Sequence, residues 1–165
     1  MAALNIGETA PDFSLPAMDA KIFSLKDALG RGPVVAVFFK ISCPTCQYAL
    51  PFLERLHKAY GAQGAMVVGV SQNAGKDTAS FLKEFGITFP VLLDDTETYP
   101  VSNAYGLTNV PTTFWIAQDG EIEISSVGWD RNDFEQIHAK MAETTRGDAV
   151  AIFQPGESVA AFRAG

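Results

Sequence analysis

Three short runs of apolar residues have the length and composition of strands that are buried on both faces of a sheet. The longest, Val34–Phe39, consists of valine, alanine and phenylalanine and follows directly after a Gly32-Pro33 pair. Residues 65–70 and residues 90–93 repeat the pattern. Continuous apolar runs of this kind are typical of parallel strands that helices cover on both sides. We therefore expect Val34–Phe39 to be the central strand of an α/β fold.

Segments with helical spacing separate these strands along the chain. Large apolar side chains recur about every four residues between Pro44 and Gly61, which predicts a helix of about four turns that ends at the glycine. Pro51 inside it predicts a kink, because proline has no backbone N–H to donate to the preceding turn. A second helix is predicted over residues 78–85. Strand and helix therefore alternate from residue 34 to residue 93.

Alternating apolar and polar residues predict a hairpin before this alternating unit. Residues 11–15 and 21–25 alternate on either side of a short turn that contains proline and aspartate. We expect this hairpin, over about residues 10–26, to cover one end of the sheet. After the third buried run, residues 97–105 are predicted to form a short helix.

A second hairpin and a last helix follow. Residues 112–116 and 122–127 flank an Asp-Gly pair, which is a strong signal for a tight turn between antiparallel strands. A mixed sheet is therefore expected. Apolar residues then recur at helical spacing from Phe134 to Met141, and Asp130 or Asn132 is the expected cap at the start of this helix.

The composition is that of a chain with a sizeable core. The chain has 165 residues, of which 47% are hydrophobic and 12 are phenylalanine, so one globular domain is expected over residues 1–146. Residues 147–165 show no clear period. We interpret them as a C-terminal extension that docks on the domain, forms a dimer contact or stays disordered.

Charge and hydropathy argue against two classes of partner. A formal net charge of -7 without a cluster of lysine and arginine argues against nucleic acid. Every apolar run is far shorter than the roughly 20 residues of a membrane helix, so no membrane partner is expected. The first residues carry neither the basic nor the apolar part of a secretory signal. This favours a cytoplasmic protein, or a periplasmic one if a signal segment has been removed.

Cys43 and Cys46 are the only cysteines of the chain, and they stand three residues apart where the central strand turns into the first long helix. Unpaired backbone N–H groups and the positive end of the helix dipole favour thiolate over thiol at such a place. Pro44 suits the first helical position. Helix geometry puts Cys43 at the mouth of the first turn and Cys46 beneath it, so the two sulfurs can form a reversible disulfide.

Three other uses of two cysteines compete with this redox interpretation. A structural zinc site needs about four ligands, and only His57 and His138 are left to join the cysteines. A purely structural disulfide would close a loop too short to stabilise the fold by much. Two inert core thiols fit poorly with a proline between them and a helix start beneath them. Neither a metal nor a cofactor is therefore expected.

Several segments beyond the cysteine pair carry a family resemblance that extends from about residue 10 to residue 141. They are the first hairpin, the strand that runs into Cys43-Pro44-Thr45-Cys46, Pro51, the helix inserted before residues 89–94, and residues 106–114 around Val110-Pro111. Together they make the chain similar to the thioredoxin-like redoxins of the AhpC/TSA type, and among these it resembles the TlpA- and ResA-like thiol-disulfide oxidoreductases.

The resemblance implies a thioredoxin-like fold with a central mixed β-sheet flanked by helices, an N-terminal β-hairpin and an inserted helix. It implies that Pro111 is a cis proline packed against the cysteines, and that the backbone of Val110 pairs with an extended substrate segment. Pro44 and Thr45 complete the implied substrate-binding residues. The implied partner is a protein or small molecule with a disulfide or dithiol. The electron donor and the direction of electron flow stay open.

The implied mechanism is thiol-disulfide exchange. Cys43 attacks a partner disulfide as a thiolate, and a mixed disulfide forms between the two molecules. Cys46 then resolves this intermediate and leaves a Cys43–Cys46 disulfide. The same steps run backward would oxidise a dithiol.

The resemblance fails at one point, the proton relay. Many relatives place a buried carboxylate beneath the cysteines, but the corresponding positions here are Val37 and Ala49. Glu97 and Glu84 are the remaining candidates, and solvated helix residues are the simpler interpretation of both. We therefore expect slower or water-mediated proton transfer to Cys46.

Two alternative functions fit parts of the same pattern. A peroxiredoxin-like thiol peroxidase would use Cys46 as the peroxidatic cysteine with Arg131 near it, but Cys43 would then replace the threonine of that family. A Sco-like metal-binding module would combine the cysteines with a distant histidine. That family has CxxxC rather than CxxC, and neither His57 nor His138 is expected beside the cysteines.

Overall fold

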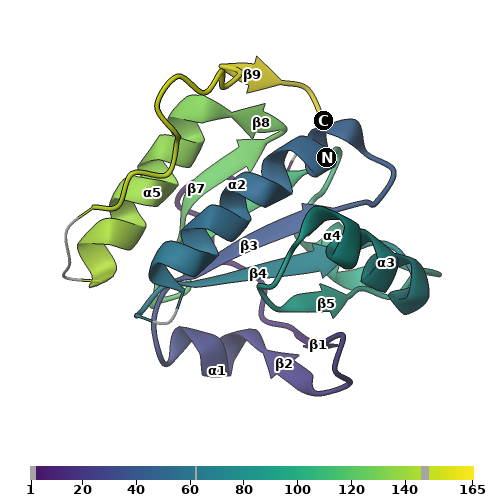
Figure 1. The fold of residues 1–165 in the computed structure, drawn as a ribbon. Coiled ribbons are helices and arrows are strands. Elements are labelled where there is room, and N and C mark those ends of the chain that lie inside the picture. The colour runs from purple at the N-terminus through teal and green to yellow at the C-terminus, as the bar shows by residue number, and fades with distance from the viewer. Residues whose placement is uncertain (1–2, 62, 146–148) are drawn as a thin grey trace.

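The structure, a computed structural model, describes residues 3–61, 63–145 and 149–165. Its helices and strands in chain order are β1 (Ser14–Pro16), β2 (Ile22–Ser24), α1 (Leu25–Leu29), β3 (Val34–Phe39), α2 (Pro44–Tyr60), β4 (Met66–Ser71), α3 (Gly75–Phe85), β5 (Val91–Leu93), α4 (Pro100–Ala104), β6 (Thr112–Ile116), β7 (Ile122–Val127), β8 (Trp129–Asp130), α5 (Arg131–Thr145) and β9 (Phe162–Arg163). Figure 1 shows how they are arranged, with α2 and α5 packed side by side.

A five-stranded mixed sheet in the order β5-β4-β3-β6-β7 is the centre of the fold. Strand β3 pairs in parallel with β4, and β4 with β5, whereas β6 runs antiparallel to both β3 and β7. The prediction of a central strand at Val34–Phe39 is confirmed, as is the mixed sheet. The β6-β7 turn contains Gly120 at a φ of +90°, a conformation that glycine adopts without strain.

Both faces of β3 are buried, as the unbroken apolar run predicts. Odd-numbered residues such as Val37 pack in one core with α2, α3 and α5. Even-numbered residues such as Phe38 pack in a second core with α1, α4 and the first hairpin. All six side chains of the strand are fully buried. Helices cover the two faces of β3 but not its carboxyl end. The start of α2, which follows this end, therefore lies near the surface.

The first hairpin is confirmed by the antiparallel pairing of β1 with β2, but its strands are shorter than predicted. The second strand of the hairpin was predicted to extend to Leu25. In the structure Leu25 begins α1, a helix that the alternation of apolar and polar residues did not predict. The Ser24 hydroxyl accepts a hydrogen bond from the Asp27 N–H at 3.2 Å and caps this helix. A serine three residues before an acidic residue is a helix-start signal that competes with strand alternation.

The boundaries of two predicted helices were also wrong. Helix α3 begins at Gly75 rather than at residue 78, and α4 covers only Pro100–Ala104 within the predicted 97–105. The buried Asp94 carboxylate accepts hydrogen bonds from the Ser102 N–H and hydroxyl at 2.8 and 2.7 Å. These bonds cap the start of α4, and Tyr99 before it has a left-handed φ of +48°, which separates α4 from the preceding turn.

Helix α2 covers Pro44–Tyr60 as predicted, and the Gly61 N–H closes it on the His57 carbonyl at 2.8 Å. Pro51 lies inside the helix, and the predicted kink there stays a prediction. Of the two caps predicted for α5, the structure supports Asp130, whose carboxylate accepts the Asp133 N–H at 2.9 Å.

Residues 149–165 of the C-terminal extension dock on the domain. Strand β9 pairs antiparallel with β8, and Ile152 is buried against the core that contains α2 and α5. Docking was one of the three interpretations of this segment.

None of the helices in the described part of the chain combines the length and the apolarity that a membrane crossing needs.

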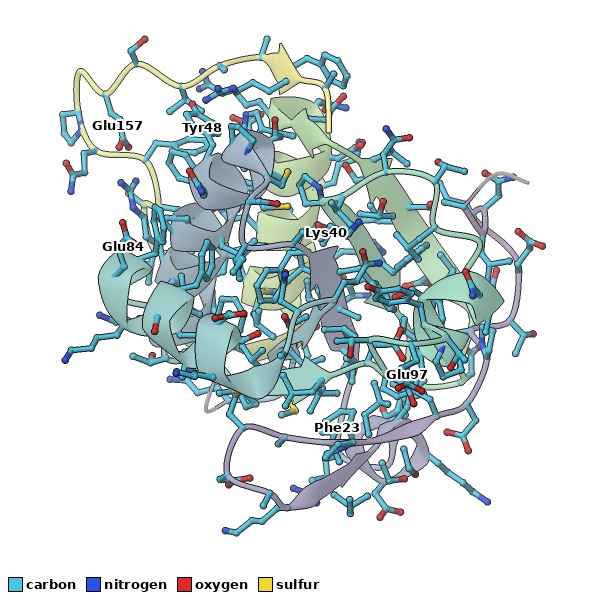
Figure 2. The ribbon with its side chains drawn as sticks, turned by 90° about the vertical axis from the view of Figure 1, so that its right-hand side faces the viewer. Phe23, Lys40, Tyr48, Glu84, Glu97 and Glu157 are labelled. Carbon is cyan, nitrogen blue, oxygen red and sulfur yellow. The ribbon has the colours of Figure 1, made fainter. Side chains whose placement is uncertain are left out.

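Replacing Glu54 by alanine is expected to destabilise the fold by about 2 to 4 kcal/mol, because buried donors would lose their acceptor. Glu54 lies on α2, is 5% exposed, and accepts hydrogen bonds from the Thr88 and Phe89 N–H groups at 2.8 and 3.1 Å. Urea unfolding would measure the loss. Glu84→Ala on the exposed face of α3 is the control, with an expected change below about 0.5 kcal/mol (Figure 2). Equal effects of the two substitutions would contradict the prediction.

Candidate functional site

Cys43 is the N-cap residue of α2. Its backbone is extended, with φ of -85° and ψ of 115°, and its Sγ accepts a hydrogen bond from the Cys46 N–H at 3.2 Å. Pro44 occupies the first turn, where no backbone donor is needed. The sulfur therefore takes the place of the oxygen that a serine or aspartate cap provides.

The two cysteines differ in exposure as the helix geometry predicts. Cys43 is partly exposed, whereas Cys46 is completely buried, and both are free thiols in the structure. Burial strongly raises the pKa of Cys46, and its hydrogen bond to Cys43 raises it further. The expectation that the helix start favours thiolate at both cysteines was therefore wrong for Cys46, because desolvation outweighs the helix N-terminus there. The nucleophile that a partner can reach is Cys43.

The backbone of Val110 faces this nucleophile. The Cys43 thiol donates to the Val110 carbonyl at 3.3 Å, across 67 positions of the chain. The Val110-Pro111 peptide bond is cis, as the resemblance implied. Among the described residues, the Val110 N–H has no hydrogen-bond partner, although its carbonyl has one. An unpaired N–H beside a reactive sulfur can pair with an extended peptide.

The side chains beneath Cys46 are apolar. Val37 is fully buried and Ala49 is 4% exposed, and both belong to the same core cluster as Cys46. Glu84 and Glu97 are exposed, Glu84 on α3 and Glu97 in the turn before α4, apart from each other in Figure 2. Glu97 is thus not a helix residue, and neither carboxylate is buried beneath the cysteines. A proton relay through either of them has no support in the structure.

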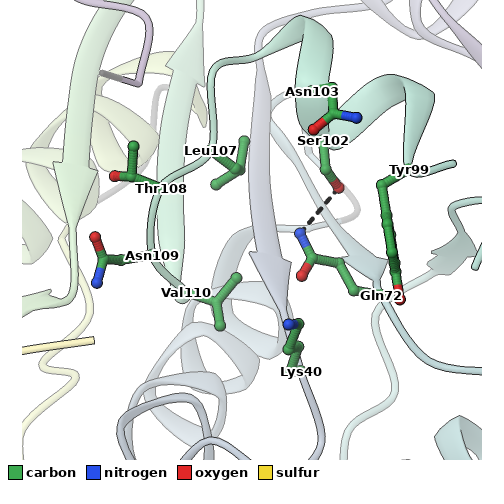
Figure 3. Close-up of a pocket in the computed structure, with 9 residues that line it drawn as sticks. All are labelled: Lys40, Gln72, Tyr99, Ser102, Asn103, Leu107, Thr108, Asn109 and Val110. Carbon is green, nitrogen blue, oxygen red and sulfur yellow. Dashed lines mark hydrogen bonds between the residues drawn. The ribbon is translucent and has the colours of Figure 1, made fainter. Parts of the chain in front are cut away.

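A polar pocket of about 220 Å³ lies beside Val110 (Figure 3). Lys40 and Gln72 line it from the ends of β3 and β4, and Asn103 lines it from α4. The Gln72 side chain donates to the Ser102 hydroxyl at 3.0 Å. These residues were not predicted. For Lys40 and Gln72, the signal was their place directly after parallel strands, where ligand-binding residues collect.

Thr45, a predicted substrate-binding residue, is covered by the chain itself. It is 6% exposed, and its hydroxyl donates to the Ala164 carbonyl at 2.6 Å. The C-terminal extension therefore reaches the cysteine motif. No local pattern in residues 147–165 signals this contact, because it joins positions 119 residues apart.

Neither His57 on α2 nor His138 on α5 lies close enough to the cysteines to share a metal with them. His57 follows Cys46 by eleven residues, about 16 Å along a helix. The His138 ring pairs with the hydroxyl of Tyr60, at the last turn of the same helix, at 2.9 Å. The structure therefore argues against a Sco-like site that uses either histidine.

The peroxidase alternative loses its support as well. Cys46, the candidate peroxidatic cysteine, is buried and has a raised pKa, whereas peroxide reacts with accessible thiolates. Arg131 forms an ion pair with Glu135 at 3.2 Å and stacks 5.0 Å from the centre of the Phe153 ring. Its contacts are those of a surface residue at a helix start.

Comparisons with known proteins agree with this geometry. The ResA thiol-disulfide oxidoreductase of Geobacillus thermodenitrificans is 34% identical over 122 residues, which cover 73% of this chain and 68% of the relative. ResA of Bacillus subtilis is 28% identical over 157 residues, 94% of this chain and 80% of that protein. The crystal structure of a thiol:disulfide interchange protein of the thioredoxin family from Chlorobium tepidum superposes with a TM-score of 0.68 at 25% identity, covering 88% of this chain and 100% of that one.

The family itself is identified by a profile rather than by single relatives. The profile of the AhpC/TSA family matches residues 6–125, which include the first hairpin, both cysteines, the cis proline and most of the second hairpin. The fold is the thioredoxin-like fold that the resemblance implied. On its sequence, its sheet topology and its paired cysteines, the chain belongs to the AhpC/TSA family.

Proposed function

We propose that this protein is a thiol-disulfide oxidoreductase that exchanges electrons with a disulfide or dithiol in an extended segment of a partner protein. The observation that carries the proposal is the arrangement at Cys43. The sulfur is partly exposed at the start of α2 and contacts the Val110 carbonyl, and the Val110 N–H has no hydrogen-bond partner within the described part of the chain. The second thiol, Cys46, lies one turn behind it.

The exchange takes place in two steps. The Cys43 thiolate attacks one sulfur of the partner disulfide, the partner's S–S bond breaks, and the other partner sulfur leaves as a thiolate. Cys46 then loses its proton and attacks Cys43 Sγ, which releases the second partner thiolate. In total, the two thiols of Cys43 and Cys46 lose two electrons and two protons and form a disulfide. The partner disulfide gains them and becomes a dithiol. Run in reverse, the same pair oxidises a dithiol.

A peptide segment fits this site because its recognition needs only backbone groups. The Val110 carbonyl faces Cys43, and the N–H of the same residue has no partner among the described residues, so a strand paired with Val110 would present a cystine sulfur to the nucleophile. Hydrogen bonds to the backbone do not distinguish one substrate sequence from another. The specificity of the exchange would then come from the neighbouring surface, which includes Lys40 and the pocket beside it.

The test is catalysis of insulin reduction. Catalytic amounts of the protein should accelerate the reduction of insulin by dithiothreitol, followed as turbidity, and Cys43→Ser should remove the acceleration. Intact-mass measurement would show the loss of two hydrogens when the protein is oxidised. A protein that oxidises by two hydrogens but never accelerates insulin reduction would overturn the proposed polypeptide substrate. Rapid turnover of hydrogen peroxide that depends on Cys46 would overturn the exchange mechanism.

A further inference from the structure

The end of the C-terminal extension lies against the surface that the proposed function assigns to the substrate. Gly165 packs so closely on the Val110 carbonyl that any side chain at position 165 would collide with it. That carbonyl is the one that accepts the Cys43 thiol. One residue earlier, the Ala164 carbonyl accepts the Thr45 hydroxyl at 2.6 Å. Residues 162–165 therefore cover both Thr45 and one backbone group of Val110.

The middle of the extension is firmly anchored. The Arg55 guanidinium donates to both carboxylate oxygens of Glu157 at 2.7 Å and to the Ile152 carbonyl at 3.1 Å. The hydrogen bond from Arg55 lowers the pKa of Glu157 to about 2, so this ion pair is present at neutral pH. Further along, the Trp129 indole donates to the Ala160 carbonyl at 2.7 Å.

The tip of the extension is held much more weakly. Residues 161–165 are all exposed, and Phe162 is 60% exposed. The tip is bound by the short β8-β9 pairing, by the Thr45 hydrogen bond, and by the Arg163 guanidinium 4.5 Å from the centre of the Tyr48 ring. Backbone pairing and one exposed cation–π contact contribute little burial. The tip therefore has fewer side-chain anchors than residues 152–160.

The tip resembles the proposed substrate segment. Both are extended chains that pair through their backbone and lie beside Cys43 and Val110. A tethered competitor needs little intrinsic affinity, because its anchor at Ala160 keeps its local concentration in the millimolar range. Cys43 itself stays partly exposed with the tip in place. Small disulfides that need no backbone pairing can still reach the sulfur, but a polypeptide must first displace the tip.

We propose that residues 162–165 are an autoinhibitory segment that occupies part of the polypeptide site and selects against protein substrates without closing the site to small disulfides. The inference rests on the proposed function and adds a regulation to it. Only the fraction of molecules with a displaced tip binds a polypeptide, so the apparent affinity falls by that fraction. A partner that binds the exposed Phe162 or Arg163 would open the site.

The experiment measures kcat/KM of the protein and its variants with two substrates, insulin and bis(2-hydroxyethyl) disulfide. Deletion of residues 162–165 should raise kcat/KM for insulin by about fivefold or more and change that for the small disulfide by less than about twofold. Arg163→Ala, which removes the contact with Tyr48, should raise the insulin value in the same direction by a smaller factor. Arg31→Ala is the matched control, since Arg31 is exposed and closely follows α1, the helix that lies at the opposite end of the molecule from β9 in Figure 1.

The outcomes separate this inference from the function on which it rests. Normal catalysis by the unaltered chain, with an insulin rate that the deletion leaves unchanged or lowers, would overturn the autoinhibition and leave the exchange activity standing. An equal rise with both substrates would also overturn it, because the tip would then shield Cys43 rather than the polypeptide site. Absence of catalysis with either substrate in every variant would overturn the proposed function and this inference together.

Discussion

Replacing Cys46 by serine should turn the protein from a catalyst into a covalent trap. Cys43 remains free to attack a partner disulfide, but no second thiol stands beneath it to release the product. The mixed disulfide should therefore persist, and turnover of insulin should fall by at least about a hundredfold. Intact-mass spectrometry of the non-reduced mixture would show one insulin molecule attached to each protein molecule, and peptide mapping would place it on Cys43.

Cys43→Ser is the matched partner of that variant and should form no adduct. Its remaining thiol, Cys46, is completely buried and has a raised pKa, so it is neither accessible nor ionised at neutral pH. Adducts on Cys46 in the Cys43→Ser protein would reverse the assignment of attacking and resolving thiols. They would also revive the peroxidase interpretation, which needs Cys46 as a nucleophile.

The second large effect is a steep pH dependence of resolution. Resolution needs the Cys46 thiolate, and burial holds the pKa of Cys46 well above its ordinary value of 9.0. If Cys46 must ionise without a partner that takes its proton, each pH unit raises the thiolate fraction about tenfold until the pKa is passed. The release of a partner from the mixed disulfide should therefore accelerate continuously from neutral pH to about pH 10, without a plateau.

Stopped-flow decay of a mixed disulfide between Cys43 and a chromogenic thiol would measure this profile. Glu97→Gln is the control and should leave the profile unchanged, because Glu97 is exposed in the turn before α4. A plateau near neutral pH would show that another group takes the proton from Cys46. If Glu97→Gln abolished that plateau, our placement of this carboxylate outside the site would be wrong.

The same raised pKa links the stability of the reduced protein to pH. The fold favours the uncharged thiol of Cys46, so this contribution is complete below the ordinary pKa of 9.0 and is lost as the pH rises toward and through the raised value. The difference in unfolding free energy between the reduced chain and Cys46→Ser should therefore shrink only in alkaline solution. Neutral and acidic conditions should leave it constant.

Elements whose side chains repeat with a strong local period were predicted well. The β3 run, the α2 helix up to Gly61 and the hairpin at Gly120 each carry their signal within a few residues, and the structure confirms all three. The errors fell where two local rules compete. At residues 24–29 a serine cap outweighed strand alternation, and before α4 the buried Asp94 moved the helix start.

The cysteine pair was found because its chemistry is written in consecutive residues. A strand end, two thiols at helical spacing and a proline between them define a nucleophile and a resolving thiol without any distant contact. The residues that complete the site are different in kind. Gln72 and Lys40 reach the same pocket only because parallel strands end at one edge of the sheet.

The sequence by itself determined the order of strands and helices from β3 to β7 and the position of the reactive thiols, because hydrophobic period, capping residues and motif spacing act over a single turn or strand. Only the tertiary structure decided how those thiols behave. The desolvation that raises the pKa of Cys46 comes from core residues throughout the sheet and α2. Likewise, Val110 and Ala164 approach the motif from 67 and 119 positions away, and contacts over such distances depend on how the whole chain packs.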